Sequence, residues 1–206
     1  MREDYTHITL VVDRSGSMNS VQEDAQGGIN SLLEEQFALD GKLTVTLVQF
    51  DTAVDTVKRL ANEKFSYELQ PRGMTALLDA VGLEIVKTGR DLALMKEADR
   101  PAKVLFVVVT DGEENSSREY TIEKVKELTE NQKSRYNWDF QFIGADQAAW
   151  AGHSLGMNTT QYVNTSAGNT TLYTTLSNST SMFRAAPVGA SFAMASNVGE
   201  TVEDNQ

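Results

Sequence analysis

The sequence contains no cysteine and only two histidines, His7 and His153. The absence of cysteine excludes a disulfide framework and any thiolate metal site, so composition gives no support to a secreted, disulfide-stapled protein. The number and spacing of the two histidines exclude a histidine-based zinc site. Basic residues are also few, 18 against 29 acidic ones, and the formal net charge is -11. Because such a chain repels phosphate backbones and anionic membranes, we expect no nucleic-acid partner and no membrane partner. The absence of cysteine makes the cytoplasm the expected location.

Long apolar runs are absent as well. The first apolar run follows charges at positions 2–4 and ends at Asp13, so it is too short for a signal core and too polar for a membrane span. A chain of 206 residues with 40% hydrophobic residues can bury one ample core. Residues 1–186 therefore predict a single domain. From Pro187 the apolar periodicity fades, and residues 187–206 predict a flexible tail.

Three runs rich in Val, Ile, Leu and Phe predict buried strands, at residues 8–12, 43–50 and 104–109. The first and third are continuously apolar, as expected for parallel strands that helices cover on both faces. The second alternates with threonine and predicts a strand with one polar side. Weaker strand signals lie at residues 54–60, 140–143 and 161–163.

Amphipathic stretches between these runs predict helices at residues 20–35, 76–87, 122–136, 147–154 and 170–184. Alternation of strands and helices favours right-handed crossovers and a Rossmann-like, open α/β sheet with helices on both faces. In such a sheet, ligands bind outside the carboxyl ends of the strands. The functional residues should therefore follow Val12 and Thr110.

Oxygen-bearing side chains follow the first and third predicted strands. Asp13-Arg14-Ser15-Gly16-Ser17 places a carboxylate and two hydroxyls on one turn, and Thr110-Asp111-Gly112 supplies a second carboxylate at the same edge of the sheet. Asp and Ser are ordinary turn residues, so the first motif alone indicates little. Two neighbouring carboxylates repel, however, and a shared cation relieves that repulsion. Oxygen ligands with few carboxylates suit hard cations such as Mg²⁺ and Mn²⁺.

These motifs resemble the metal-ion-dependent adhesion site (MIDAS) of von Willebrand factor A domains. That family combines an Asp-x-Ser-x-Ser loop, a separate Thr, for which Gly73-Met74-Thr75 qualifies, and a later Asp-Gly. The resemblance covers roughly residues 6–145. It implies a mostly parallel sheet with one antiparallel edge strand, and direct metal coordination by Ser15, Ser17 and Thr75. Asp13 and Asp111 would lie close to the ion or act through water.

The resemblance also implies a function. An ion held mainly by neutral hydroxyls keeps enough positive charge to attract an added carboxylate, which in this family comes from an Asp or Glu of a protein partner. We therefore expect a metal-dependent protein-binding module rather than an enzyme, with Mg²⁺, Mn²⁺ or Ca²⁺ as the cation. Stand-alone domains of this size resemble bacterial and bacteriophage members of the family. Two alternatives stay open: a metal-dependent phosphohydrolase built on Asp13 and Asp111, and an assembly protein with a purely structural ion.

Two other motifs are set aside on context. Gly152-His153-Ser154-Leu155-Gly156 matches the nucleophile elbow of α/β-hydrolases, but the residues before it predict a helix rather than a strand, and no histidine follows Ser154. An EF-hand loop starting at Asp13 would need Gly and Glu where Met18 and Asp24 stand. Glu113 and Glu114 are interpreted as solvated loop charges rather than part of the site.

Overall fold

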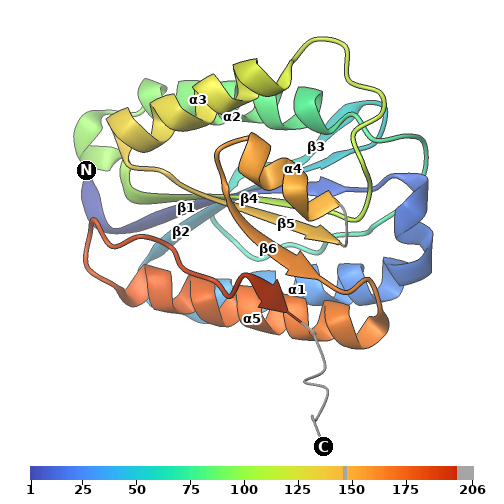
Figure 1. The fold of residues 1–206 in the computed structure, drawn as a ribbon. Helices are drawn as coiled ribbons and strands as arrows, with labels where there is room; N and C mark the ends of the chain where they lie inside the picture. Colours follow the sequence, from blue (N-terminus) through green and yellow to red (C-terminus); the bar gives the residue numbers. More distant parts are fainter. Residues whose placement is uncertain (146–147, 199–206) are drawn as a thin grey trace, which may run out of the picture.

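The structure is a computed structural model that describes residues 1–145 and 148–198. Seven strands form one sheet in the order β3-β2-β1-β4-β5-β6-β7 (Figure 1). The strands are β1 (Arg2–Asp13), β2 (Lys42–Phe50), β3 (Val54–Ala61), β4 (Pro101–Thr110), β5 (Asp139–Ala145), β6 (Asn158–Tyr162) and β7 (Asn197–Val198). β3 pairs antiparallel with β2, whereas every other neighbouring pair is parallel. The predicted fold class, with its antiparallel edge strand, is confirmed.

Helices cover both faces of the sheet (Figure 1). They are α1 (Gln22–Ala38), α2 (Leu77–Leu94), α3 (Ile122–Tyr136), α4 (Ala149–Ser154) and α5 (Ser166–Ala185), with two short 3-10 helices, η1 (Gly16–Val21) and η2 (Glu97–Asp99). One apolar core joins the sheet to α1 and α5, and the other joins it to α2 and α3. Both faces of the central strands are therefore buried, which explains their continuous apolar sequence.

The central strand, β1, determines where the functional residues meet. It lies between β2 and β4, with Asp13 opposite Phe50 and Val12 opposite Val109. Since these strands are parallel, their carboxyl ends reach the same edge. Asp13 and Asp111 therefore emerge side by side, although they lie far apart in the sequence.

Two local predictions need correction. The helix expected from residue 20 begins as η1 at Gly16 and continues as α1 from Gln22. The sequence predicts a tail from Pro187, but Phe192 and Val198 are buried and β7 joins the sheet, so the packed chain extends to residue 198. Residues 199–206 of that tail, and residues 146–147 before α4, lie outside the described residues. Within the described ranges, no helix is long and apolar enough to cross a membrane.

Candidate metal site

The structure brings the five predicted ligand residues together at the carboxyl edge of the sheet. Ser15 Oγ lies 2.9 Å from Ser17 Oγ, which donates a 2.6 Å hydrogen bond to Asp111 Oδ1. Asp13 Oδ1 accepts a 2.6 Å hydrogen bond from the backbone N–H of Ser15. Thr75 stands just before α2. Three separate segments therefore contribute oxygen atoms to one small volume.

Asp13 is the most deeply buried of the five, with none of its surface exposed. Its Oδ2 accepts a 2.5 Å hydrogen bond from Thr110 Oγ1, so both carboxylate oxygens have a donor. Desolvation nevertheless raises the pKa of Asp13 to about 6, with the nearby charge of Asp111 adding to the shift. An ionised Asp13 is thus under electrostatic stress that a bound cation would relieve.

Asp111 is held from two sides. Ser17 Oγ binds its Oδ1, and Asn164 Nδ2 donates a 3.2 Å hydrogen bond to its Oδ2. Desolvation raises the pKa of Asp111, although these two hydrogen bonds oppose the shift. Asn164 follows β6 and precedes α5, so it lies far from Asp111 in sequence. Sequence analysis missed it, and its place directly after a strand is the signal that could have identified it.

Thr75 is fixed through its backbone rather than its hydroxyl. Asn115 Oδ1 accepts a 2.9 Å hydrogen bond from Thr75 N, and Asn115 N donates one of 3.0 Å to Thr75 O. Its backbone is thus restrained on both sides, and its Oγ1 lies beside Gly112. Asn115 is a second residue that sequence analysis missed.

A geometric test shows that these oxygens converge on one point. A Cβ placed on Gly112 would lie 3.0 Å from Thr75 Oγ1, 3.4 Å from Ser17 Oγ and 3.5 Å from Asp13 Oδ2. Three kinds of oxygen-bearing side chain, from residues 13–17 and the loop that carries Thr75, therefore surround a space next to a residue without a side chain. The donor set consists of hydroxyls and carboxylates and fits a hard divalent cation. In the described part of the chain, no cluster of three or more His, Cys, Asp or Glu side chains could hold a metal ion, so a cation at this place would need the hydroxyls as ligands.

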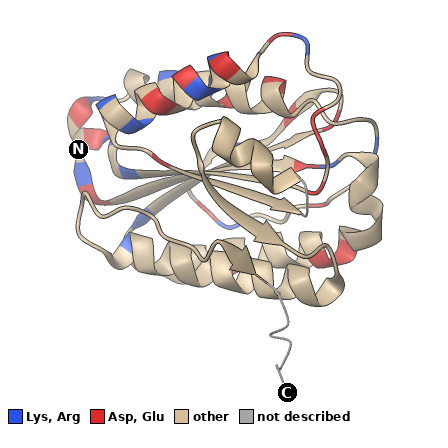
Figure 2. Cartoon of the chain, in the orientation of Figure 1, with Lys and Arg blue, Asp and Glu red and all other residues tan. Residues whose placement is uncertain are grey.

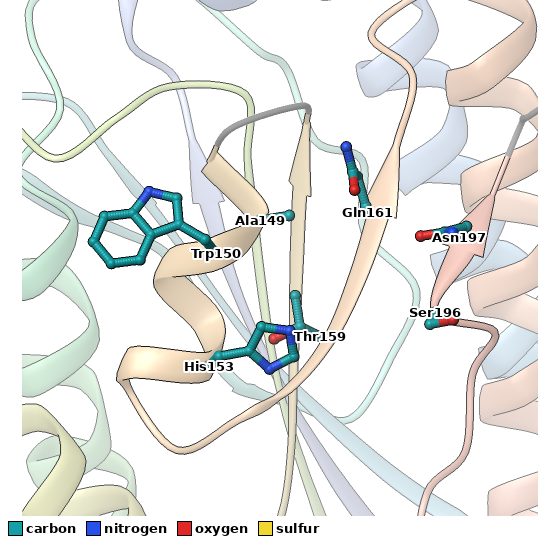
Figure 3. A pocket seen from close by; sticks show the side chains of 7 residues that line it. All are labelled: Ala149, Trp150, His153, Thr159, Gln161, Ser196 and Asn197. Atoms are coloured by element: carbon teal, nitrogen blue, oxygen red, sulfur yellow. The ribbon is translucent and has the colours of Figure 1, made fainter.

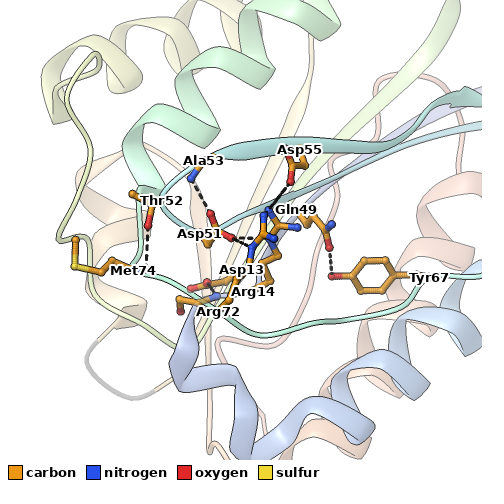
Figure 4. A network of polar contacts seen from close by, with 11 residues as sticks. Asp13, Arg14, Gln49, Asp51, Thr52, Ala53, Asp55, Tyr67, Arg72 and Met74 are labelled. Atoms are coloured by element: carbon orange, nitrogen blue, oxygen red, sulfur yellow. Dashed lines mark hydrogen bonds and ion pairs between the residues drawn. The ribbon is translucent and has the colours of Figure 1, made fainter.

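A four-charge cluster fixes the two ligand loops relative to each other (Figure 4). Arg14 is only 4% exposed and donates to Asp51 Oδ2 over 2.9 Å, while its other end binds Asp55. Arg72, from the loop before Thr75, donates to the same Asp51 oxygen over 2.7 Å. These two cations hold the pKa of Asp51 below its usual value against desolvation. We call Arg14, Asp51, Asp55 and Arg72 the loop clamp.

Backbone hydrogen bonds reinforce this contact. Gly16 N donates to Gly73 O over 3.2 Å, and Arg72 N donates to Arg14 O over 2.8 Å. Gly73 has a φ of +70°, and a Cβ there would lie 3.0 Å from Thr52 Oγ1. Glycine is required at this position because the backbone is left-handed and closely approached. These bonds thus hold the loop that carries Ser15 and Ser17, the serine loop, against the loop that carries Thr75, the threonine loop.

The two glutamates after Gly112 and the serine of the Gly-x-Ser-x-Gly motif lie near this edge. Glu114 is not a solvated charge, because it accepts hydrogen bonds from Leu78 N, Ser116 N and Ser117 N at 2.9, 2.8 and 2.7 Å. It joins the loop after β4 to the start of α2. Glu113 is exposed, in agreement with its interpretation as a solvated loop charge. Ser154 ends α4, so the residues before it are helical and do not form the strand that a nucleophile elbow requires.

Comparisons with known proteins place this architecture. No protein-family model matches the chain, and no curated protein matches it. Among solved structures, the von Willebrand factor domain of the type V pili tip protein Mfa5 from Porphyromonas gingivalis has a TM-score of 0.61 at 11% identity, with 89% of this chain and 97% of that one covered. A von Willebrand factor type A protein from Catenulispora acidiphila has a TM-score of 0.58 at 13% identity, with coverage of 84% and 42%.

The ArnB paralog VWA2 from Sulfolobus acidocaldarius has a TM-score of 0.52 at 17% identity, with coverage of 84% and 44%. This chain therefore spans less than half the length of two of the three solved structures. Identities this low establish the architecture alone. The mostly parallel sheet with one antiparallel edge strand and flanking helices matches the fold of these neighbours: the chain has the fold of a von Willebrand factor A domain.

Proposed function

We propose that this protein is a metal-dependent protein-binding module. The convergence of Thr75, Ser17 and Asp13 oxygens around the space beside Gly112 carries the proposal. Ser15, Ser17 and Thr75 would hold the ion directly, and Asp13 and Asp111 would act close to it or through water. The cation is Mg²⁺ or Mn²⁺, with Ca²⁺ as the third candidate, since all take oxygen ligands.

The charge balance of the site supports protein binding. When bound, a divalent cation supplies positive charge and an open coordination position for one added oxygen ligand. Asp13 and Asp111 are the two carboxylates among the five predicted ligands, and Ser17 and Asn164 already donate hydrogen bonds to the two oxygens of Asp111. A partner Asp or Glu would complete the coordination. We propose that the partner of the present chain is a protein and that the two meet in the cytoplasm.

We propose further that the chain is not an enzyme. The buried carboxylate of Asp13 accepts structural hydrogen bonds from Thr110 and Ser15, and Ser154 stands at the end of a helix. A metal-dependent phosphohydrolase is the alternative to be tested. Turnover of a generic phosphoester that disappears in Asp13→Asn would overturn the binding-module assignment. Ser154→Ala is expected to leave any such activity unchanged.

Thermal unfolding tests the metal half of the proposal. A ligand at 100 times its dissociation constant stabilises the folded state by about 2.7 kcal/mol, so millimolar Mg²⁺ or Mn²⁺ should raise the Tm and a chelator should reverse the rise. Asp13→Ala should abolish the metal-induced shift. Asp91→Asn is a matched control. Asp91 is a carboxylate on α2 that pairs with Arg59 of β3, and both residues lie outside the ligand loops. An unchanged shift in Asp13→Ala would show that the ligands are assigned wrongly.

Capture of a partner tests the second half. Immobilised protein should retain a partner in Mg²⁺ and release it when EDTA is added, and Thr75→Ala should lose both effects. Retention that EDTA does not affect would leave the ion with a structural role only.

A further inference from the structure

An apolar hollow adjoins the proposed metal site. Its volume is about 130 Å³, and Gly112, Glu113 and Glu114 of the ligand loop form one side of it. The other sides are Leu77, Leu78, Ile122, Ala148, Trp150, Ala151, Ser154 and Leu155. Gly112 thus borders both the converging ligand oxygens and the hollow. A group bound at the ligand oxygens would therefore lie next to the hollow.

Large apolar side chains stand exposed around this edge. Trp150 is 61% exposed and Ile122 is 40% exposed, and both line the hollow. Met74, beside Thr75, is 52% exposed. Exposed aromatic and large apolar residues gathered at one edge are typical of protein-binding surfaces.

Trp150 also separates this hollow from a second one. The second hollow, of about 520 Å³, lies between α4 and the β6–β7 edge and is lined by Ala149, Trp150, His153, Thr159, Gln161, Ser196 and Asn197. In Figure 3 the indole ring of Trp150 points away from Gln161 and Asn197. The ring therefore extends the wall of the smaller hollow, although Trp150 also lines the larger one.

The size and charge of the smaller hollow define its occupant. Small-molecule sites usually enclose roughly 300–1,000 Å³, so 130 Å³ suits a single side chain. Its charged lining residues are Glu113 and Glu114, with no Lys or Arg among them. Figure 2 shows that α4, which lines the hollow, and the strands β6 and β7 are almost free of charged residues. A second carboxylate would be repelled here, whereas an uncharged apolar side chain would not.

We infer that the protein partner presents, within a few residues of its metal-bound carboxylate, one large apolar side chain that fills the hollow beside Gly112. The inference rests on the proposed function and names the chemistry of its partner. The cation attracts the carboxylate, and burial of the apolar side chain against Leu78, Trp150 and Ile122 supplies selectivity among acidic segments. A buried anchor of this kind carries much of the energy in many interfaces.

Fluorescein-labelled peptides test the inference. Each contains one Glu in a neutral or basic sequence, with Leu, Phe or Ser at one of the next few positions. Anisotropy titrations are run in Mg²⁺ and in EDTA, with a Gln-for-Glu peptide as a control. The best Leu or Phe peptide should bind about tenfold more tightly than its Ser counterpart, a gain of about 1.4 kcal/mol, and only in Mg²⁺.

Variants of the hollow locate the effect. Trp150→Ser removes part of the wall and Ala151→Leu fills the space, so each should erase the preference for Leu or Phe while keeping the Mg²⁺-induced rise in Tm. Leu94→Ser is the matched control, since Leu94 is 77% exposed at the carboxyl end of α2. It should change neither property.

The outcomes separate the two proposals. Metal-dependent binding without preference for an apolar side chain would overturn this inference and leave the proposed function standing. Apolar peptides that bind equally in Mg²⁺ and EDTA would overturn metal-mediated binding itself. A Tm shift with Mg²⁺ but no binding of any peptide would also overturn the inference.

Discussion

Ser17 Oγ donates a 2.6 Å hydrogen bond to Asp111 Oδ1, and so joins the loop after β1 to the loop after β4. The contact orients two of the five proposed ligands without any metal. A cation would meet a site that is largely preformed, because the partners of Asp13, Thr75 and Asp111 are already in place. Affinity should therefore depend on individual hydroxyls rather than on rearrangement of the loops.

Ser17→Ala should weaken Mn²⁺ binding about tenfold, or about 1.4 kcal/mol, because it removes one oxygen ligand. The metal-free protein should lose only about 1 kcal/mol of stability, the usual value of one hydrogen bond. Calorimetric titration with Mn²⁺ and thermal unfolding measure the two effects. Ser20→Ala is the control, since Ser20 Oγ makes only a 3.4 Å contact with Ser17 O. Equal Mn²⁺ affinity in both variants would contradict the assignment of Ser17.

Asp51→Asn should weaken Mn²⁺ binding even though Asp51 is not a proposed ligand. It is the common partner of Arg14 and Arg72 in the loop clamp, and its side chain is only 6% exposed. Breaking a buried ion pair costs about 3 kcal/mol, and it also frees the serine loop from the threonine loop.

The comparison for this variant is Asp55→Asn. Asp55 belongs to the same clamp, but its side chain is 51% exposed, so its loss should have a much smaller effect. Calorimetric Mn²⁺ titrations of both variants measure the difference. If Asp51→Asn lowers the Tm but keeps the wild-type Mn²⁺ affinity, the clamp stabilises the fold without positioning the ligands.

Two adjacent glycines in α1 should respond in opposite ways to alanine. A Cβ on Gly28 would lie 2.1 Å from Tyr173 Cδ2 of α5, whereas a Cβ on Gly27 meets nothing within 4 Å. Gly28→Ala should therefore destabilise the protein by about 1–3 kcal/mol through overpacking. Gly27→Ala should stabilise it by about 0.5–1 kcal/mol through helix propensity. Urea unfolding of both variants tests the pair, and a loss of stability in Gly27→Ala would contradict the open space beside Gly27.

His7 should make the fold sensitive to acid. It has no exposed surface, and desolvation lowers its pKa from 6.5 to about 3. Between these values the unfolded state binds one more proton than the folded state. Stability due to His7 is therefore complete above pH 6.5 and falls by about 1.36 kcal/mol per pH unit as the pH decreases toward 3.

Urea unfolding of wild type and His7→Gln at several pH values between 4 and 6.5 isolates this effect, because Asp13 and the other carboxylates contribute equally to both proteins. The difference between their unfolding free energies should change by the slope of one proton. A difference that does not vary with pH would show that His7 is protonated in the folded state.

Much of the architecture could be predicted from local sequence. The continuous apolar runs of β1 and β4 indicate strands buried on both faces, and the helix predicted over residues 122–136 is α3 with the same bounds, Ile122–Tyr136. The ends of the predicted strands also indicated Asp13, the last residue of β1, and Asp111, the first residue after β4, because parallel strands end at one edge. These features depend on residues that are neighbours in the sequence and on the alternation of strands and helices along the chain, and both can be observed in the sequence.

Other features appear only when distant segments pack together. The alternating threonines of β2 predict one polar side, and the structure places that side in the interior, where Thr44 Oγ1 lies 2.8 Å from both Tyr5 OH and His7 Nδ1. Sequence analysis did not identify these partners. β7, the pairing of Arg14 with Asp51, and the Asn164 contact with Asp111 were likewise missed.

The sequence alone determined the fold class and the oxygen-bearing residues of the proposed metal site, because hydrophobic periodicity and strand ends are local properties. Only the tertiary structure decided which polar residues support those ligands, since a side chain's partner depends on where another segment passes. The hollow beside Gly112 is of the same kind. It exists because α2, α4 and the loop after β4 meet there, and no one of these segments encodes it.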